Sequence, residues 1–170
     1  MTFRFEDHEP ERYRRLSRMV GIAMAAQLIV LSLIFTQLLN AFFEGGFWLN
    51  VLAVVLGLAA TSLIVVRLRR KDWMGPISYG WRLKQRLSRV SGYLPALRRG
   101  LEANDPKALA VLGFYHQGMA QLAELDGRTM DDDAELLAER QRVRLARLEL
   151  GLDARVEGLD DADLAGFQRG

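Results

Sequence analysis

One histidine in this chain lies where it could carry out chemistry. His116 follows Tyr115 in a segment of helical pattern, and a histidine can gain or lose a proton near neutral pH. A zinc site needs three or four ligands, and the chain contains no cysteine that could supply them. We therefore interpret His116 as a packed or surface histidine rather than as a ligand.

The acidic run Asp131–Asp133 is the second candidate, because carboxylates bind divalent cations. Neighbouring carboxylates at the start of a helix do not converge on one ion, whereas a calcium loop spaces its ligands in alternation. Thr129 and Asp132 instead fit a capping box at a helix start. The sequence also lacks a glycine-rich phosphate loop and a Ser/His/Asp set. We expect no enzyme activity and no metal or cofactor.

The elements that carry these residues follow two long uncharged segments. Between Arg18 and Arg67 the only ionisable residue is Glu44. Met19–Phe43 and Phe47–Val66 are each long enough, as helices, to cross a hydrocarbon core of about 30 Å. The sequence therefore predicts an all-α protein, with a two-helix transmembrane hairpin followed by a small cytoplasmic helical bundle or helical hairpin.

Small and polar residues repeat every four positions in both segments. Such stripes let membrane helices approach closely, and their hydroxyls or amides can bond across the contact. Two interpretations remain open: the stripes hold the hairpin together, or one of them faces another protein. A transport pathway is disfavoured because no ionisable group lies within either span. The stripes are Ser32, Thr36 and Asn40, then Ala53, Gly57 and Thr61.

Basic residues precede the first span and follow the second, and the turn that connects the two spans has none. The positive-inside rule then places both termini in the cytoplasm and the turn outside. The segment 67–102 has ten basic and two acidic residues, a net charge of +8, whereas 103–170 has eight and fourteen, a net of −6. We expect the basic part to lie against the bilayer and not against nucleic acid. The candidate lipid headgroup contacts are Arg67, Arg69, Arg70, Lys71, Arg82 and Lys84.

Three cytoplasmic helices are expected after the spans. The first has a seam of apolar residues every three or four positions, and we expect Pro95 to kink it without ending it. The second should begin at Asp105-Pro106 and stop near Gly127. The third has a weaker seam of Leu137, Gln141, Leu145, Leu148, Leu152 and Val156. The candidate helix-interface residues are Leu87, Val90, Leu94, Leu97, Tyr115 and His116, and whether they form a core or a binding surface stays open.

Four regions result from these expectations. They are a basic leader at 1–18, a hairpin at 19–66, a cytoplasmic helical domain at 67–158 and a flexible acidic tail at 159–170, which has little to bury. His8, in the leader, is expected to be solvated.

Several short motifs resemble a family of uncharacterised two-pass inner-membrane proteins of proteobacteria. They are Gly80-Trp81-Arg82-Leu83-Lys84, Phe114-Tyr115-His116-Gln117-Gly118 with Gln121, and Leu125-Asp126-Gly127. The resemblance runs from the leader to about Gly127 and implies the same membrane topology, without an activity or a catalytic residue. We expect a non-enzymatic accessory protein whose partners are the bilayer and either another membrane complex or a second copy. The alternative is a membrane-surface regulator or lipid-binding module.

Overall fold

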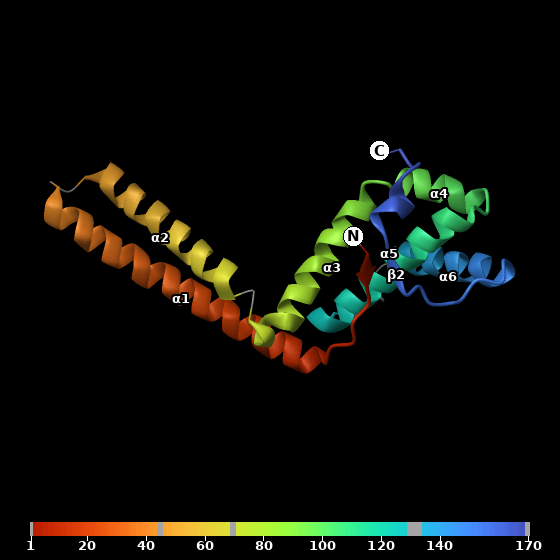
Figure 1. The fold of residues 1–170 in the computed structure, drawn as a ribbon, viewed down its shortest axis with the longest axis horizontal. Helices are drawn as coiled ribbons and strands as arrows, with labels where there is room; N and C mark the ends of the chain where they lie inside the picture. Colours follow the sequence, from red (N-terminus) through yellow and green to blue (C-terminus); the bar gives the residue numbers. More distant parts are fainter. Residues whose placement is uncertain (1, 44–45, 69–70, 129–133, 169–170) are drawn as a thin grey trace. The chain divides into compact units, whose positions relative to one another are not determined.

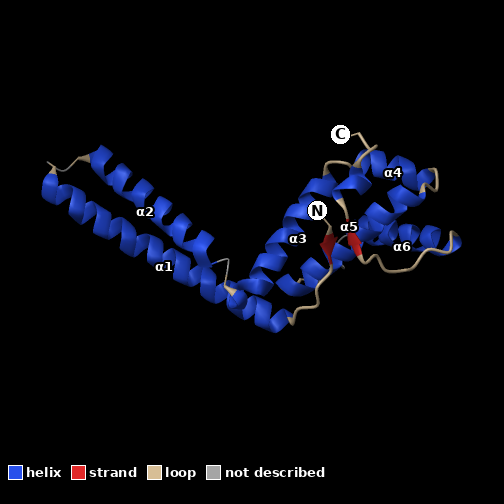
Figure 2. Ribbon diagram, in the orientation of Figure 1, coloured by secondary structure: helices blue, strands red, loops and turns tan. Residues whose placement is uncertain are grey.

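The computed structural model describes residues 2–43, 46–68, 71–128 and 134–168, and within them the fold is all-α apart from one small sheet (Figures 1 and 2). The helices are α1 (Pro10–Phe42), α2 (Phe47–Leu68), α3 (Gly75–Ser91), α4 (Leu94–Glu102), α5 (Pro106–Asp126) and α6 (Ala134–Glu149). The strands are β1 (Phe3–Arg4) and β2 (Gly158–Leu159), and the short 3-10 helices are η1 (Asp72–Met74) and η2 (Asp161–Leu164). The expected helical hairpin followed by a helical bundle is confirmed.

The chain forms two compact units. The hairpin unit is Arg12–Ser78, and the helical unit combines Met1–Glu11 with Tyr79–Gly170. The expected regions differ from these units at both ends of the chain. The first residues of the leader belong to the helical unit, and so does the acidic tail.

The hairpin unit contains the two helices that are long and apolar enough to cross a membrane. Their large apolar side chains are exposed, as at Leu33 (60 %) and Leu58 (55 %). The buried residues of α2 are Ala53, Gly57 and Thr61. A Cβ on Gly57 would lie 2.6 Å from the Ser32 hydroxyl oxygen and 3.1 Å from the Ser32 backbone nitrogen. The small-residue stripe of α2 is thus the surface on which α1 and α2 come together.

Two hydroxyl groups of the hairpin bond within their own helices, whereas the buried Thr61 hydroxyl has no hydrogen-bond partner. The Thr36 hydroxyl donates to the Ser32 carbonyl at 2.9 Å, and the Ser62 hydroxyl donates to the Leu58 carbonyl at 2.8 Å. Asn40 is exposed. Close backbone approach, rather than cross-helix hydrogen bonding, is therefore what these stripes provide between α1 and α2.

In the helical unit, α5 carries the largest group of buried side chains. A Cβ on Gly118 of α5 would lie 2.9 Å from a Leu87 methyl and 3.2 Å from a Leu83 methyl, so this glycine lets α3 pack closely. Gly100 of α4 does the same against Ala108, at 2.4 Å. Leu87, Val90 and Leu97 are all buried, and Leu94 is partly exposed. The leucine seam of α3 and α4 is therefore core.

The expected kink at Pro95 is wrong, because the helix ends at Ser91 and a new one begins at Leu94. Pro95 then falls in the first turn of α4, where a missing backbone N–H removes no helical hydrogen bond.

The boundaries of α5 are confirmed. Asp105 caps its start by accepting from the Lys107 backbone N–H, and Gly127 ends it in the left-handed conformation at φ 70°. The expected capping box at Thr129 and the acidic run Asp131–Asp133 lie outside the described residues.

Helix α6 buries Glu139, Val143 and Arg147, which are spaced four residues apart. The Arg147 guanidinium donates to the Leu109 carbonyl at 3.3 Å and to the Asp153 carbonyl at 2.7 Å. Burial lowers the pKa of Arg147 from its usual value. The expected seam of α6 is wrong at Gln141, Leu145 and Leu148, which are exposed, whereas Leu137 is partly buried. Its last two members, Leu152 and Val156, lie beyond the end of the helix at Glu149.

Candidate functional site

The N-terminal leader is a structural part of the helical unit. Strand β1 pairs antiparallel with β2, with Phe3 opposite Leu159 and Arg4 opposite Gly158 (Figure 2). The Phe3 ring stacks on Tyr79 with centroids 5.7 Å apart, and the Phe5 ring lies 5.0 Å from that of Phe114. Aromatic rings of this size bury a large apolar area, so the leader contributes side chains to the hydrophobic core of the helical unit.

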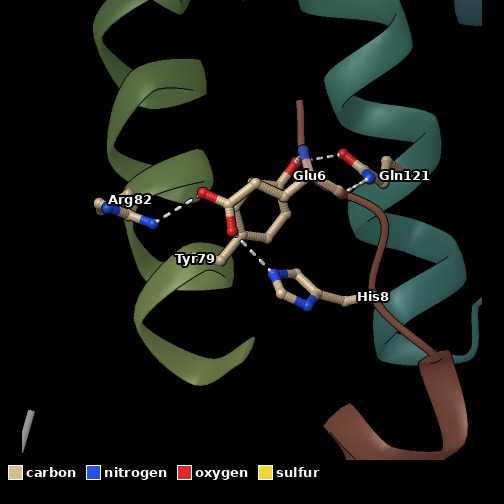
Figure 3. Close-up of polar contacts among 5 residues, drawn as sticks. All are labelled: Glu6, His8, Tyr79, Arg82 and Gln121. Atoms are coloured by element: carbon tan, nitrogen blue, oxygen red, sulfur yellow. Dashed lines mark hydrogen bonds and ion pairs between the residues drawn. The ribbon is translucent and has the colours of Figure 1, made fainter. Parts of the chain in front are cut away.

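A polar cluster fixes the leader between α3 and α5 (Figure 3). The Tyr79 hydroxyl donates to the Gln121 side-chain oxygen at 2.6 Å and accepts from the Glu6 backbone N–H at 3.3 Å. The Gln121 amide nitrogen donates to the Glu6 carbonyl at 2.7 Å. Burial raises the pKa of Tyr79, so the phenol keeps its proton and can make both bonds. Tyr79 and Gln121 thus satisfy both backbone groups of Glu6.

The Glu6 carboxylate makes the cluster's charged contacts. One of its oxygens lies 3.1 Å from Arg82, and the other lies 3.0 Å from His8 Nε2 (Figure 3). The expectation that His8 is solvated is corrected, because its side chain is only 21 % exposed and its ring meets Tyr79 at 4.8 Å. The Glu6 and Arg82 side chains are 49 % and 56 % exposed, and exposed ion pairs contribute little. The rings and backbone bonds therefore hold the leader more than the charges do.

The acidic tail also folds onto the helical unit, so the expectation that it has little to bury is wrong. Leu159 and Leu164 are 2 % and 6 % exposed. The Thr2 hydroxyl donates to the Asp160 carboxylate at 2.6 Å, and this bond with that from the Ala162 backbone lowers the pKa of Asp160 to about 2. Asp161 pairs with Arg86, and with Arg89 at 2.8 Å.

A buried charge cluster joins α4, α5 and α6. Glu139 is 4 % exposed and accepts from Arg98 at 2.7 and 3.1 Å. His116 is 2 % exposed, and its Nε2 lies 3.5 Å from the second Glu139 oxygen, without a hydrogen bond on either ring nitrogen. Burial lowers the pKa of His116, although Glu139 opposes that shift. The interpretation of His116 as packed agrees with this position, but its carboxylate neighbour was not expected.

The remaining candidate residues differ in surroundings. Arg82 and Lys84 are paired with Glu6 and Asp126, Arg67 and Lys71 are exposed, and Tyr115 is partly buried. Arg69 and Arg70 lie outside the described residues.

The contacts that hold the N-terminal leader were not predicted from the sequence. Its one local signal is the alternation Phe3-Arg4-Phe5, which is the period of a strand.

The two clusters consist of contacts within the helical unit. Within the described residues no group of three His, Cys, Asp or Glu side chains could hold a metal ion. A pocket of about 250 Å³ beside the leader is lined by Asp7, His8, Glu9, Pro10, Gln121, Glu124 and Leu125. The polar atoms of Tyr79 and Gln121 are used in binding the leader itself.

Comparison with known proteins identifies a family and no activity. A family model described as "Protein of unknown function (DUF3087)" matches residues 3–162. The match extends well past Gly127, where the resemblance in the sequence was expected to end, and includes α6, β2 and the start of η2. No curated protein and no solved structure matches the chain significantly. Because the family model covers nearly the whole chain, the protein belongs to the DUF3087 family of proteins of unknown function.

Proposed function

We propose that this protein is a non-enzymatic accessory protein of a bacterial inner membrane. Its two apolar helices cross the bilayer as a hairpin, and its helical unit is a cytoplasmic docking module for a membrane complex or for itself. The motif resemblance to two-pass proteobacterial proteins supports the membrane and the source. The sequence offers no catalytic motif, which supports a binding role.

The observation that carries the topology is the pairing of Phe3 with Leu159. Phe3 precedes the first apolar helix and Leu159 follows the second, yet both belong to one small sheet. Segments that pair in this way must lie on the same side of a membrane. An even number of crossings between them is required, which supports a two-pass hairpin with both termini together. The basic residues at both hairpin ends favour the cytoplasmic side.

The lipid-binding alternative has weaker support. Of its six expected headgroup contacts, Arg82 and Lys84 are within 3.2 Å of carboxylates of the same unit. Arg67 and Lys71, which follow the second span, are exposed and keep this alternative open. Their contribution to membrane attachment would add to that of the hairpin rather than replace it.

Reporter fusions and co-purification test the proposal. An enzyme active only outside the cytoplasm, fused after Gly46, should be active, whereas the same enzyme fused after Gly170 should be inactive. Activity of the Gly170 fusion would overturn the topology. Tagged full-length protein extracted from native membranes in mild detergent should bring down a defined partner or a second copy of itself. Recovery of the monomer alone would overturn the docking role.

A further inference from the structure

Helix α6 buries two charged side chains and leaves two leucines exposed, which is unusual for a surface helix. Its buried stripe is Glu139, Val143 and Arg147, two of which are charged. On the opposite face lie Ala134, Ala138, Gln141, Leu145 and Leu148, and all five are exposed. Leu145 and Leu148 are 52 % and 50 % exposed. A surface helix normally turns its leucines to the core and its charges to water.

The exposed face has the spacing of a helix-pairing seam. Its members follow one another at intervals of four, three, four and three residues, which is the heptad spacing of paired helices. Alanine at two of these positions permits close approach of a second helix, and the leucines supply apolar area. We propose that this seam, Ala134 to Leu148, is a self-association surface on which α6 of a second copy packs in parallel. The inference deepens the proposed docking role and rests on it.

Charge favours a second copy in parallel orientation. In a parallel pair, the residue just before Leu145 lies near the partner-helix residue whose sequence number is five higher. Arg144 then meets Glu149 of the second copy, and the reverse contact is identical. In the antiparallel alignment that packs Leu145 on Gln141, Arg142 meets Arg142 and Glu135 meets Glu149. Like charges at those flanking positions disfavour the antiparallel pair.

The amide in the seam favours the same orientation. In a parallel two-fold pair each seam residue faces its own counterpart, so Gln141 meets Gln141. A glutamine amide has both donors and an acceptor, so two of them can satisfy each other. In the antiparallel pair Gln141 would face Leu145 and lose hydrogen bonds on desolvation. A single polar seam residue that is satisfied in one register is a known device for fixing that register.

Because the chain has no cysteine, single cysteines can report this contact in native membranes. Leu148→Cys should form a covalent dimer of the full-length protein on mild oxidation, since the two thiols face each other only in the parallel pair. Arg140→Cys is the matched control, an exposed position on α6 outside the seam. Failure of Leu148→Cys to dimerise, or equal dimer yield from Arg140→Cys, would overturn the proposal. So would cross-linking of Leu148→Cys only to a different protein.

Substitutions at exposed positions of α6 test the seam and its register without disturbing the core. Leu145→Glu should raise the concentration for half-dimerisation in detergent by about tenfold or more, because it places a charge where a leucine would be buried. Arg144→Glu should lower the cross-linking yield of Leu148→Cys, and adding Glu149→Arg should restore it. Loss without restoration would contradict the parallel pairing. If Leu145→Glu leaves the dimer intact but releases another co-purifying protein, the self-association inference fails while the docking function stands.

Discussion

Phe3 and Leu159 are register partners in an antiparallel sheet, although they lie near opposite ends of the chain and on opposite sides of two apolar helices in the sequence. Both side chains are buried, at 8 % and 2 % exposure. This contact makes the leader part of the helical unit. It also explains how a two-residue strand can persist, since the aromatic rings beside it supply the area that two backbone pairs cannot.

The first prediction concerns the strand pairing. A Cβ on Gly158 would lie 2.1 Å from the Phe3 carbonyl oxygen and 3.1 Å from its carbonyl carbon, both backbone atoms. Gly158→Ala should therefore separate β1 from β2. Hydrogen exchange of the leader amides should accelerate by at least about tenfold. Gly75→Ala, where a Cβ would meet no atom within 4 Å, is the control. Equal protection of the leader in both variants would show that the pairing does not hold it.

The second prediction concerns the hairpin. Gly57→Leu places a side chain where the Ser32 backbone already lies within about 3 Å of a Cβ position, so α1 and α2 must move apart. The variant should unfold at a lower denaturing-detergent fraction than the parent, as followed by tryptophan fluorescence. Gly21→Leu, at an open position of α1, should leave the transition unchanged. An unaltered transition in Gly57→Leu would place that face against lipid.

The third prediction concerns the core of the helical unit. Leu97 is fully buried and Leu94 is not, so truncation should cost more at Leu97. Leu97→Ala should lower the free energy of unfolding by about 2–5 kcal/mol. Leu94→Ala should cost less than Leu97→Ala, because less of its side chain is removed from water. Chemical unfolding of the two full-length variants in mild detergent compares them directly, and equal losses would contradict this assignment of the core.

The fourth prediction concerns pH. Burial lowers the folded-state pKa of His116, so the unfolded chain binds a proton more readily. This site therefore subtracts no stability well above the unfolded pKa of about 6.5, and it subtracts progressively more as the pH falls below it. Thermal unfolding of the parent should show this loss between about pH 7 and 5. His116→Gln should flatten the dependence, because it removes the group whose pKa burial lowers. A slope that survives His116→Gln must come from another group.

Local signals predicted the parts of the fold that depend on local chemistry. The start of α5 followed from Asp105 and Pro106, and its end followed from Gly127, because capping is decided within a few residues. The end of α3 was missed because the apolar seam continues in register across Gly92 and Tyr93, so periodicity does not reveal the break. The break between α3 and α4 occurs there because Pro95 is tolerated in the first turn of a helix and not in a helix interior.

Pairings between distant segments were not predictable. The contact of His116 with Glu139, and that of Thr2 with Asp160, join elements whose separation in sequence gives no periodic signal. The opposite net charges of segments 67–102 and 103–170 are consistent with ion pairs between them, but the basic segment was interpreted as attracted to the membrane. In the structure, Lys84, Arg86 and Arg98 pair with Asp126, Asp161 and Glu139. Much of that asymmetry is therefore compensated within the helical unit.

The small sheet also sets the order in which the protein can be completed. Strand β1 is synthesised before both apolar helices, and β2 is synthesised after α6. The strand at Phe3 and Arg4 therefore has no strand partner until both apolar helices and α3 to α6 have been synthesised. A nascent chain that stops before Gly158 has no strand partner for its leader and can hold it only through contacts with α3 and α5. Closure of this sheet thus marks synthesis past β2, and products shortened before it should hold their leader less firmly and be cleaved there more readily by proteases.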